Sequence, residues 1–572
     1  MDKTIRRRAP KESSFGEHLH PILAQVYASR GIVSSEQLEH ELPRMLAPSL
    51  LKGIEQAASL LIDAIRANQR IVIVGDFDAD GATSTALMMD GLRLLGSTNH
   101  DFIVPNRFEY GYGLTPEISD LAAQAGAEVI VTVDNGISCH QGVDRAKQHG
   151  CTVIVTDHHL PSDKAPNADA IVNPNQHGCE FPSKALAGVG VAFYLMLMVR
   201  QLMRKENYFS EHQLAEPNLA QLLDLVALGT VADVVSLDHN NRILVAQGLK
   251  RIRHGATRPG IQALIEIAGK NQRKLCASDF GFGLGPRLNA AGRLDDMSLG
   301  IRCLLATDMY QARMIAAQLD DLNQERRQIE RGMQVEAEQI LQQLNFTKDS
   351  LPSALALYQD DWHQGVIGIV AGRIKEKYHR PTIVFAQGDD GFIKGSARSI
   401  VGLHIRDLLE HIDSQHPNLI VKFGGHAMAA GLTIGEQDFE QFQQLFNQYA
   451  SAQLTDDLLQ GVILSDGELS TDCFNLAFAE LLKNAGPWGQ SFPEPVFDNT
   501  FAVLQQRIVG DKHLKMVVQQ GDLAIDAIAF NVDLQKWPNP NCQWVHMAYK
   551  LDVNEFRQKQ SLQLLVEHIE SA

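Results

Sequence analysis

Short apolar runs alternate with helix-forming stretches in the first third of the chain. Four runs are rich in β-branched residues: IVIVGD at 71–76, DFIVP at 101–105, EVIVTVD at 128–134 and TVIVTD at 152–157. Apolar residues on both faces are typical of central strands in a sheet that is covered on both sides. Stretches between them, such as 84–96 and 136–150, have helix-spaced apolar residues and end in glycine. This succession predicts β-α-β units and a parallel sheet.

The pattern changes three times further along the chain. Residues 307 to about 344 have apolar positions three and four residues apart and no proline, which predicts a long helix, more a connector than a core element. A second α/β pattern runs to about residue 450. Beyond about residue 455 the short alternating runs TFAVLQQRIV, HLKMVVQQ, LAIDAIAF and QWVHMAYKLDV predict a small antiparallel barrel or sandwich.

The length of 572 residues predicts two to four domains. No run of eighteen uncharged apolar residues occurs, and the first residues, MDKTIRRRAPKESS, lack the apolar segment of a secretory signal. We therefore expect a cytoplasmic protein without a membrane partner. Seven scattered cysteines without a C-x-x-C pair argue against a disulfide framework and a zinc knuckle.

A net charge of −17 weakens the case for a nucleic-acid binder, which usually has a basic footprint. It does not exclude a nuclease, because carboxylates can gather metal ions while a few arginines line the substrate track. We expect the basic run from Lys3 to Lys11 to be a solvated tail rather than a nucleic-acid contact.

Three predicted strands end in side chains that bind metal ions. These are Asp76, Asp78 and Asp80 after the first strand, Asp134 after the third, and Asp157, His158 and His159 after the fourth. Ligands of open parallel sheets bind at the carboxyl ends of strands. While the chain stays extended, alternate positions would send the first three carboxylates to one side.

Such carboxylates would repel one another unless cations lay among them, so the cluster implies divalent metal. An oxygen-rich set with one or two imidazoles suits Mn²⁺ or Mg²⁺ better than zinc. The alternative is that an aspartate before glycine caps a helix or turn, which is the better interpretation of any one of them. Three strand ends together favour a metal site. Asp233 follows a helical stretch and either joins this site or begins a turn.

GDFDADG, VDNG, TDHH and GTVADVV, in this order, resemble the four motifs of the DHH phosphoesterases. The blocks LAGVGVAFYL, GPRLNAAGRL, WHQGVIGIVAGRIKEKY, GSARS and FGGHAMAAG are similar to the branch of exonucleases specific for single-stranded DNA, over nearly the whole chain. The resemblance implies an α/β protein with a parallel-sheet DHH domain, a long connecting helix, an α/β DHHA1 domain and a C-terminal β-barrel of the OB-fold. The implied bounds are 1–50 for an N-terminal segment, 51–300, 301–345, 346–450 and 455–572.

The same resemblance implies a two-metal centre. Asp134 would bridge the metals, Asp78 would complete one site, and Asp80, His158 and Asp233 the other. His159 would face the phosphate, and Asp157 would orient a histidine rather than bind metal. Other branches place a histidine four residues before Asp78, where this chain has Val74, so Asp76 is the candidate substitute.

Candidate DNA contacts follow from the glycine-rich motifs, because guanidinium groups and hydroxyls suit phosphate oxygens. By resemblance, Arg107, Ser396 and Arg398 form a pocket for the 5′ phosphate, and Tyr112 stacks on a terminal base. Further candidates are Arg287, Asn289, Arg293 and His426, and, in the OB groove, Arg507, Lys512 and Lys515. The alternative for the arginines is a salt bridge, for His426 a packed histidine, and for the tail cations solvated charge.

We therefore expect a metal-dependent 5′→3′ exonuclease that degrades single-stranded DNA to mononucleotides in repair and recombination. Alternatives are a phosphodiesterase acting on short oligonucleotides or cyclic dinucleotides, and a non-catalytic single-strand-binding scaffold. By resemblance, a single-strand-binding protein and a helicase are the expected partners, and we expect a monomer.

Overall fold

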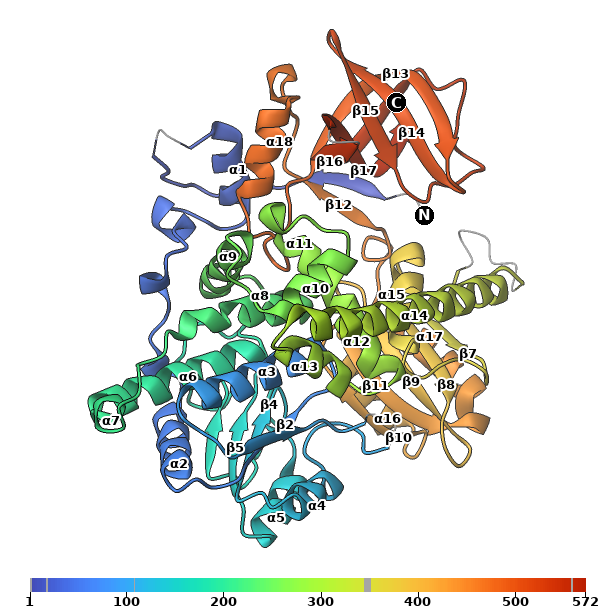
Figure 1. The fold of residues 1–572 in the computed structure, drawn as a ribbon. Coiled ribbons are helices and arrows are strands. Elements are labelled where there is room, and N and C mark those ends of the chain that lie inside the picture. Colours follow the sequence, from blue (N-terminus) through green and yellow to red (C-terminus); the bar gives the residue numbers. More distant parts are fainter. Residues whose placement is uncertain (1–2, 17–18, 107–108, 344–350, 557–558) are drawn as a thin grey trace.

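The computed structural model describes residues 3–16, 19–106, 109–343, 351–556 and 559–572 (Figure 1). The strands are β1 Thr4–Arg7, β2 Ile71–Gly75, β3 His100–Ile103, β4 Val129–Val133, β5 Thr152–Thr156, β6 Ala170–Val172, β7 Leu355–Tyr358, β8 Thr382–Gln387, β9 Phe392–Arg398, β10 Ile420–Gly425, β11 Ala429–Gly435, β12 Val462–Ser465, β13 Phe497–Val509, β14 His513–Gln520, β15 Leu523–Ala529, β16 Trp544–Phe556 and β17 Lys559–Ser571. The helices are α1 Pro21–Ser29, α2 Ile54–Arg66, α3 Ala79–Leu94, α4 Pro116–Gln124, α5 His140–Gln148, α6 Gly188–Lys205, α7 Tyr208–Glu211, α8 Leu223–Ala232, α9 His239–Arg253, α10 Pro259–Ile267, α11 Ala277–Asp279, α12 Gly285–Leu294, α13 Ser298–Leu305, α14 Met309–Gln343, α15 Ile367–Tyr378, α16 Ile405–Gln415, α17 Phe439–Ser451 and α18 Leu476–Asn484. None of the helices in these ranges is long and apolar enough to cross a lipid bilayer.

The first sheet has the order β3, β2, β4, β5, β6, and all its strands are parallel. Helices α4 and α5 cover one face, and α2, α3 and α6 cover the other (Figure 1). Alternate residues of β2 point to opposite sides: Val72 and Val74 pack toward α4 and α5, and Ile71 and Ile73 join the core on the other face. This arrangement confirms the predicted covered parallel sheet, and it brings the carboxyl ends of β2, β4 and β5 to one edge.

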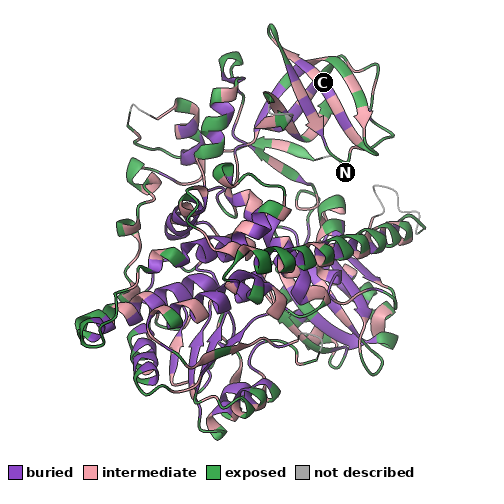
Figure 2. Cartoon of the chain, in the orientation of Figure 1, coloured by how far each residue is buried: buried purple, intermediate pink, exposed green. Residues whose placement is uncertain are grey.

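The long helix α14 links the first α/β region to the second. It begins at Met309 and not at residue 301, because Ser298–Leu305 forms the separate helix α13 and the Asp308 side chain accepts a hydrogen bond from Gln311 N at the start of α14. Its early buried residues, such as Leu319, join the first core, whereas Met333 joins a core under the second sheet. One side of the helix stays exposed along its length (Figure 2). It is therefore both a connector and a part of two cores.

The second sheet has the order β10, β11, β9, β8, β7, and only β7 and β8 pair in parallel. The last five strands close into a barrel in the order β13, β14, β15, β17, β16. The barrel is not wholly antiparallel as the pattern predicted, because β15 and β17 run parallel. Its core includes Phe497, Phe501 and Tyr549, which are fully buried.

The basic N-terminal run is not the solvated tail that the sequence predicted. It forms β1, which pairs in parallel with β12 at the base of the barrel (Figure 1). Arg7 donates hydrogen bonds to the Asp498 carboxylate, at 2.8 Å for the shortest, and to Glu468 at 2.6 Å. The partners lie more than 450 residues away in sequence, so composition alone could not reveal them.

Candidate metal centre

The acidic ends of β2, β4 and β5 meet at one edge of the first sheet, where Asp233, the residue that follows α8, joins them. Three groups of side chains have ligand atoms within 4.8 Å of one another. These groups are Asp76 with Asp78 and Asp134; Asp80 with His158 and Asp233; and Asp134 with His158 and His159. Asp134 and His158 each belong to two of the groups, so the two carboxylate-rich sets adjoin.

The backbone that places the three aspartates after β2 at this edge differs from the extended chain that the sequence suggested. The chain does not stay extended: β2 ends at Gly75 and α3 begins at Ala79. The Asp78 carboxylate accepts hydrogen bonds from Asp80 N and Gly81 N, so Asp78 caps α3 as well as facing the cluster. Asp80 lies in the first turn of the helix and therefore points to the second group. Val74 is buried in β2 and cannot contribute a ligand.

The amino end of α6 holds Asp80, a contact that sequence reasoning missed. Gly188 N donates to Asp80 Oδ2 at 2.6 Å and Val189 N to Oδ1 at 3.0 Å. A Cβ atom at Gly188 would lie 2.6 Å from Asp134 Cβ, so only glycine allows the helix to approach this closely. The glycines of LAGVGV were the available signal for this approach.

Three polar atoms converge at the middle of the centre. His158 Nε2 lies 3.1 Å from Asp134 Oδ1 and 3.5 Å from Asp233 Oδ2. All three atoms are buried, and none has a hydrogen-bond partner in the described part of the chain. Asp134 and Val234 both have positive φ angles, of 61°, a conformation that costs free energy in a β-branched residue such as Val234. Unsatisfied buried ligand atoms on strained backbone are expected where a cation completes the structure.

The electrostatics of these residues also indicate a metal site. Burial, followed by the neighbouring carboxylates, raises the pKa of Asp134 and of Asp233 well above the usual range and that of Asp80 to about 7. Burial and the adjacent His159 lower the pKa of His158 to about 4, so its ring is neutral at pH 7, the form that binds metal. An oxygen-rich donor set with one neutral imidazole fits Mn²⁺ or Mg²⁺.

His159 lies at the edge of the centre and is oriented by Asp157. Asp157 Oδ1 lies 2.7 Å from His159 Nδ1, and Oδ2 accepts a hydrogen bond from Ile137 N. Burial alone would lower the pKa of His159, but the hydrogen bond and charge of Asp157 outweigh it and raise the pKa to about 9. The His426 ring faces that of His159, with centroids 6.5 Å apart, so the second α/β region reaches the centre. The Tyr112 hydroxyl donates to Asp134 O at 3.1 Å.

A cavity of about 410 Å³ adjoins Asp78, between the two α/β regions. Its lining includes Asn289, Arg293, Ser396 and Arg398, four of the predicted DNA contacts, and the amino end of α15. No ion pair in the described ranges involves Arg398; its guanidinium donates only to Ser396 and to Ala397 O. Lys394 also lines the cavity and was missed, because nothing in the sequence distinguishes it from a surface lysine.

Other predicted contacts have different surroundings. Arg287 is buried, pairs with Asp320 of α14 at 2.8 Å and donates to Gly283 O, so it forms the salt bridge that was the alternative and is not placed to bind phosphate. Asn289 Oδ1 accepts a hydrogen bond from Ala79 N and anchors the start of α3. Arg107 lies outside the described residues.

The three barrel cations lie on or beside β13 and β14. Arg507 and Lys515 are directly opposite each other on the two strands, and Lys512 lies in the turn between them. Like charges opposite each other are unfavourable unless an anion lies over them. Lys515 approaches Asp526 of β15 at 3.7 Å, which offsets part of its charge.

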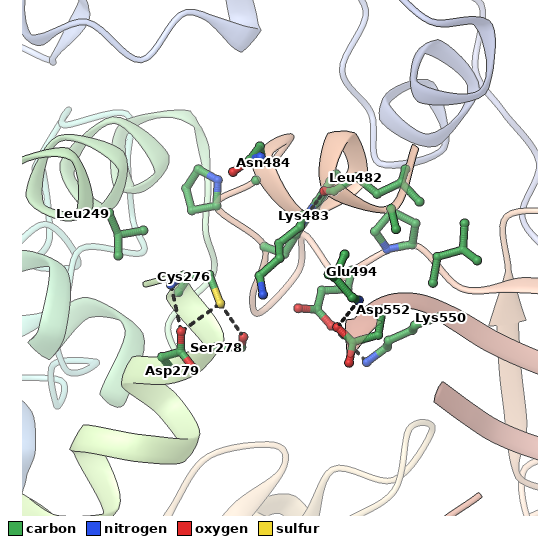
Figure 3. A pocket seen from close by; sticks show the side chains of 18 of the residues that line it. Leu249, Cys276, Ser278, Asp279, Leu482, Lys483, Asn484, Glu494, Lys550 and Asp552 are labelled. Atoms are coloured by element: carbon green, nitrogen blue, oxygen red, sulfur yellow. Dashed lines mark hydrogen bonds and ion pairs between the residues drawn. The ribbon is translucent and has the colours of Figure 1, made fainter. Parts of the chain in front are cut away.

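A second cavity, of about 620 Å³, separates the first α/β region from the barrel (Figure 3). Two of its lysines pair with acids of the same wall: Lys270 lies 2.8 Å from Asp279, and Lys550 lies 3.2 Å from Glu494. The Cys276 thiol donates to Asp279. Its lining lacks the converging unpaired ligand atoms of the metal centre, so we do not assign chemistry to it.

Comparison with known proteins agrees with this architecture. Family models match residues 70–230 (DHH family, N-terminal domain), 351–452 (DHHA1 domain) and 465–568 (RecJ OB domain). The single-stranded-DNA-specific exonuclease RecJ of Dickeya dadantii is 57% identical over 567 residues, which cover 99% of this chain and 98% of that protein. The chain belongs to the RecJ family. The family member from Escherichia coli K12 is 55% identical over 99% of this chain and 98% of its own length.

Solved RecJ structures have the same fold. RecJ from Thermus thermophilus in complex with Mn²⁺ is similar with a TM-score of 0.80 and 29% identity, over 97% of this chain and 76% of that one. Its complex with Mg²⁺ gives a TM-score of 0.74 and 28% identity, over 97% and 75%. The DHH sheet, the DHHA1 region and the barrel are thus the RecJ arrangement.

Proposed function

We propose that this protein is an exonuclease that degrades single-stranded DNA from the 5′ end to mononucleotides and requires two Mn²⁺ or Mg²⁺ ions. The supporting observation is the pair of adjoining ligand groups, Asp76 with Asp78 and Asp134 and Asp80 with His158 and Asp233, which a third group containing Asp134 and His158 links. The chain is also closely related to exonucleases specific for single strands. Asp76 and Asp78 would hold one ion, Asp80, His158 and Asp233 would hold the other, and Asp134 would contribute to both.

The chain's own residues then have distinct tasks. When bound, the ions lower the pKa of a water molecule and neutralise charge on the phosphate. His158 stays neutral and serves as a ligand. His159, protonated at pH 7 and held by Asp157, donates to a phosphate oxygen from the open side of the centre.

The cavity beside Asp78 is the proposed site of the 5′ phosphate. Ser396, Arg398 and Arg293 offer donors there, and the α15 amino end favours an anion. An anion site next to the centre would confine cleavage to the 5′ end. Tyr112 and His426, which flank His159, would contact the terminal nucleotide.

The barrel supports a polymeric substrate over a cyclic dinucleotide. We assign Arg507, Lys512 and Lys515 to the backbone of the single strand, as is common in OB-folds. A role in repair and recombination in the cytoplasm, action as a monomer, and recruitment by a helicase and a single-strand-binding protein remain predictions.

Digestion of end-labelled oligonucleotides tests the proposal. Single strands labelled at either end are incubated with Mn²⁺, with Mg²⁺ or with EDTA, and a duplex and a cyclic dinucleotide serve as competing substrates. We expect mononucleotides from the 5′ end of single strands only, and only with metal. Release from the 3′ end, preference for the cyclic dinucleotide, binding without cleavage, or activity in EDTA would each contradict it.

A further inference from the structure

A highly exposed phenylalanine lies in the segment that packs on the end of α8, the helix that leads to Asp233. Phe282 is 81% exposed and belongs to a π-helical turn, Phe280–Leu284, that leads directly into α12. Such turns are rare and occur frequently at functional sites. An exposed aromatic ring in such a turn is available to stack on a planar ligand.

This π-helical turn packs on the last turn of α8, which ends at Asp233. A Cβ atom built at Gly281 would lie 3.8 Å from Val231 Cγ1, and one at Gly285 would lie 3.2 Å from Ala232 Cβ. The residue after Asp233, Val234, is 62% exposed and has a positive φ angle. Phe282, in the turn that packs on this end of α8, and Val234, which follows Asp233, are thus both exposed apolar side chains, and we call the pair the apolar rim.

The segment that carries Phe282 continues to the 5′-phosphate cavity. At the other end of the same segment, Asn289 lines that cavity and binds Ala79 N. Positions 282 and 289 are separated by about 10 Å along a helix axis, at about 1.5 Å per residue. Stacked nucleotides rise about 3.4 Å each, so this span corresponds to about three nucleotides.

The apolar rim is also continuous with the approach to the barrel. Leu237 N donates to Gln490 O at 2.9 Å, and the Ser236 and Ser491 hydroxyls lie 2.8 Å apart, just before β13 begins. Residues 233–237 therefore lead from the metal centre toward the barrel. A strand that spans both would pass the apolar rim.

We propose that the Phe282 ring stacks on a base about three nucleotides from the 5′ end of the single strand, with Val234 beside it. This inference rests on the proposed function. Stacking on an aromatic ring tolerates any base, and it requires an unpaired one, so Phe282 also favours single strands over duplexes. Its role is to position substrate, not to take part in the chemistry.

Substrates of two lengths test the inference. Phe282→Ala is expected to raise KM for a 5′-phosphorylated 20-mer by about tenfold and to leave kcat, and turnover of a 5′-phosphorylated dinucleotide, unchanged. Phe282→Trp should restore KM. Tyr310→Ala, which removes a ring that is 77% exposed at the start of α14, is the matched control and should behave as wild type.

The outcomes separate the two proposals. A KM for the 20-mer within twofold of wild type, or an equal loss on dinucleotide and 20-mer, would overturn the role of Phe282. A wild-type protein without activity on any single strand would instead refute the proposed function. A 20-mer with 2-aminopurine as third nucleotide gives a second measurement: its fluorescence should be quenched by wild type and less by Phe282→Ala.

Discussion

Buried aspartates gather at two places in this molecule, and their surroundings differ. At the junction between the N-terminal segment and the barrel, Arg30 donates to both oxygens of Asp466, and both side chains are 1% exposed. At the metal centre, in contrast, no lysine or arginine of the described ranges forms an ion pair with Asp80, Asp134 or Asp233. The fold neutralises one cluster from within and leaves the other to cations from solution.

The comparison shows that burial of an acid does not identify a site by itself. A buried carboxylate with its own arginine is structural, and removing either partner leaves an uncompensated charge. Carboxylates that face only one another destabilise the fold until a cation binds. Replacing an aspartate by asparagine should therefore lower stability at the junction but not in the metal-free metal centre.

The largest effect is expected from loss of the shared ligand. Asp134→Ala should reduce exonuclease activity by about a thousandfold or more, because metal ions contribute several kcal/mol to stabilising the charged transition state. Initial rates on a labelled single strand in Mn²⁺ measure this activity. Adding EDTA to the wild-type protein should reduce the rate by a similar factor. Activity of the variant within tenfold of wild type would remove Asp134 from the centre.

The next effect concerns stability and has opposite signs in the two clusters. Asp466→Asn should lower the free energy of unfolding by about 3 kcal/mol, because it leaves Arg30 buried without its partner. Asp134→Asn should not destabilise the metal-free protein, because it removes repulsion and asparagine tolerates the positive φ angle. Denaturant unfolding in EDTA checks both. Equal destabilisation by the two substitutions would abolish the distinction.

The same contrast between a residue with a partner inside the fold and one without applies to two arginines, Arg287 and Arg398. Arg398→Ala should raise KM for 5′-phosphorylated strands by roughly tenfold or more, since a hydrogen bond to a charged group contributes about 1.5–3 kcal/mol. Arg287→Ala should leave KM unchanged and lower stability, because it leaves Asp320 without its buried partner. Measuring KM for strands with phosphorylated and unphosphorylated 5′ ends distinguishes the two variants. A higher KM for Arg287→Ala would mean that Arg287, too, binds the substrate.

The fold was largely predictable, because two-sided apolar runs leave few arrangements other than a covered parallel sheet. The structure brings the predicted ligand residues together, but the geometric reason given for Asp80 was wrong. A period of two applies only to an extended chain, and α3 starts at Ala79. The family motif grouped Asp80 with His158 and Asp233, and the structure places these three side chains close together.

What the sequence could not provide were partners distant along the chain. Arg287 and Arg398 have similar local surroundings in sequence, yet Asp320 pairs with Arg287, whereas no acid among the described residues pairs with Arg398. Arg7 meets Asp498 only because β1 pairs with β12. Such contacts depend on tertiary structure, so each arginine had two open interpretations until the fold was known.

The smallest expected effect is the pH dependence of the metal-free protein. The pKa of Asp80 is raised to about 7 and those of Asp134 and Asp233 are raised well above the usual range, whereas unfolding returns all three to about 4. The unfolded state thus releases protons that the folded state retains, so stability falls as pH rises toward the folded pKa values. His158 has a pKa of about 4 in the folded protein, so it has the opposite effect on stability, but only below about pH 6.5, where the unfolded chain's histidine gains a proton. In EDTA, the unfolding temperature should therefore drop by roughly 5 °C between pH 6.5 and 8.5.

The junction supplies the control for this pH profile. The hydrogen bonds from Arg7 and Ser465 outweigh the effect of burial and hold the pKa of Asp498 below its usual value. The contribution of Asp498 to the free energy of unfolding is therefore complete above about pH 4 and is lost only as the pH falls further. Asp498→Asn should accordingly lower the unfolding temperature at every pH from 6.5 to 8.5 without changing the slope, whereas Asp134→Asn or saturating Mn²⁺ should flatten it. A wild-type profile that is flat in EDTA, or one that Mn²⁺ leaves unchanged, would mean that these carboxylates are neutralised within the fold, as at the junction.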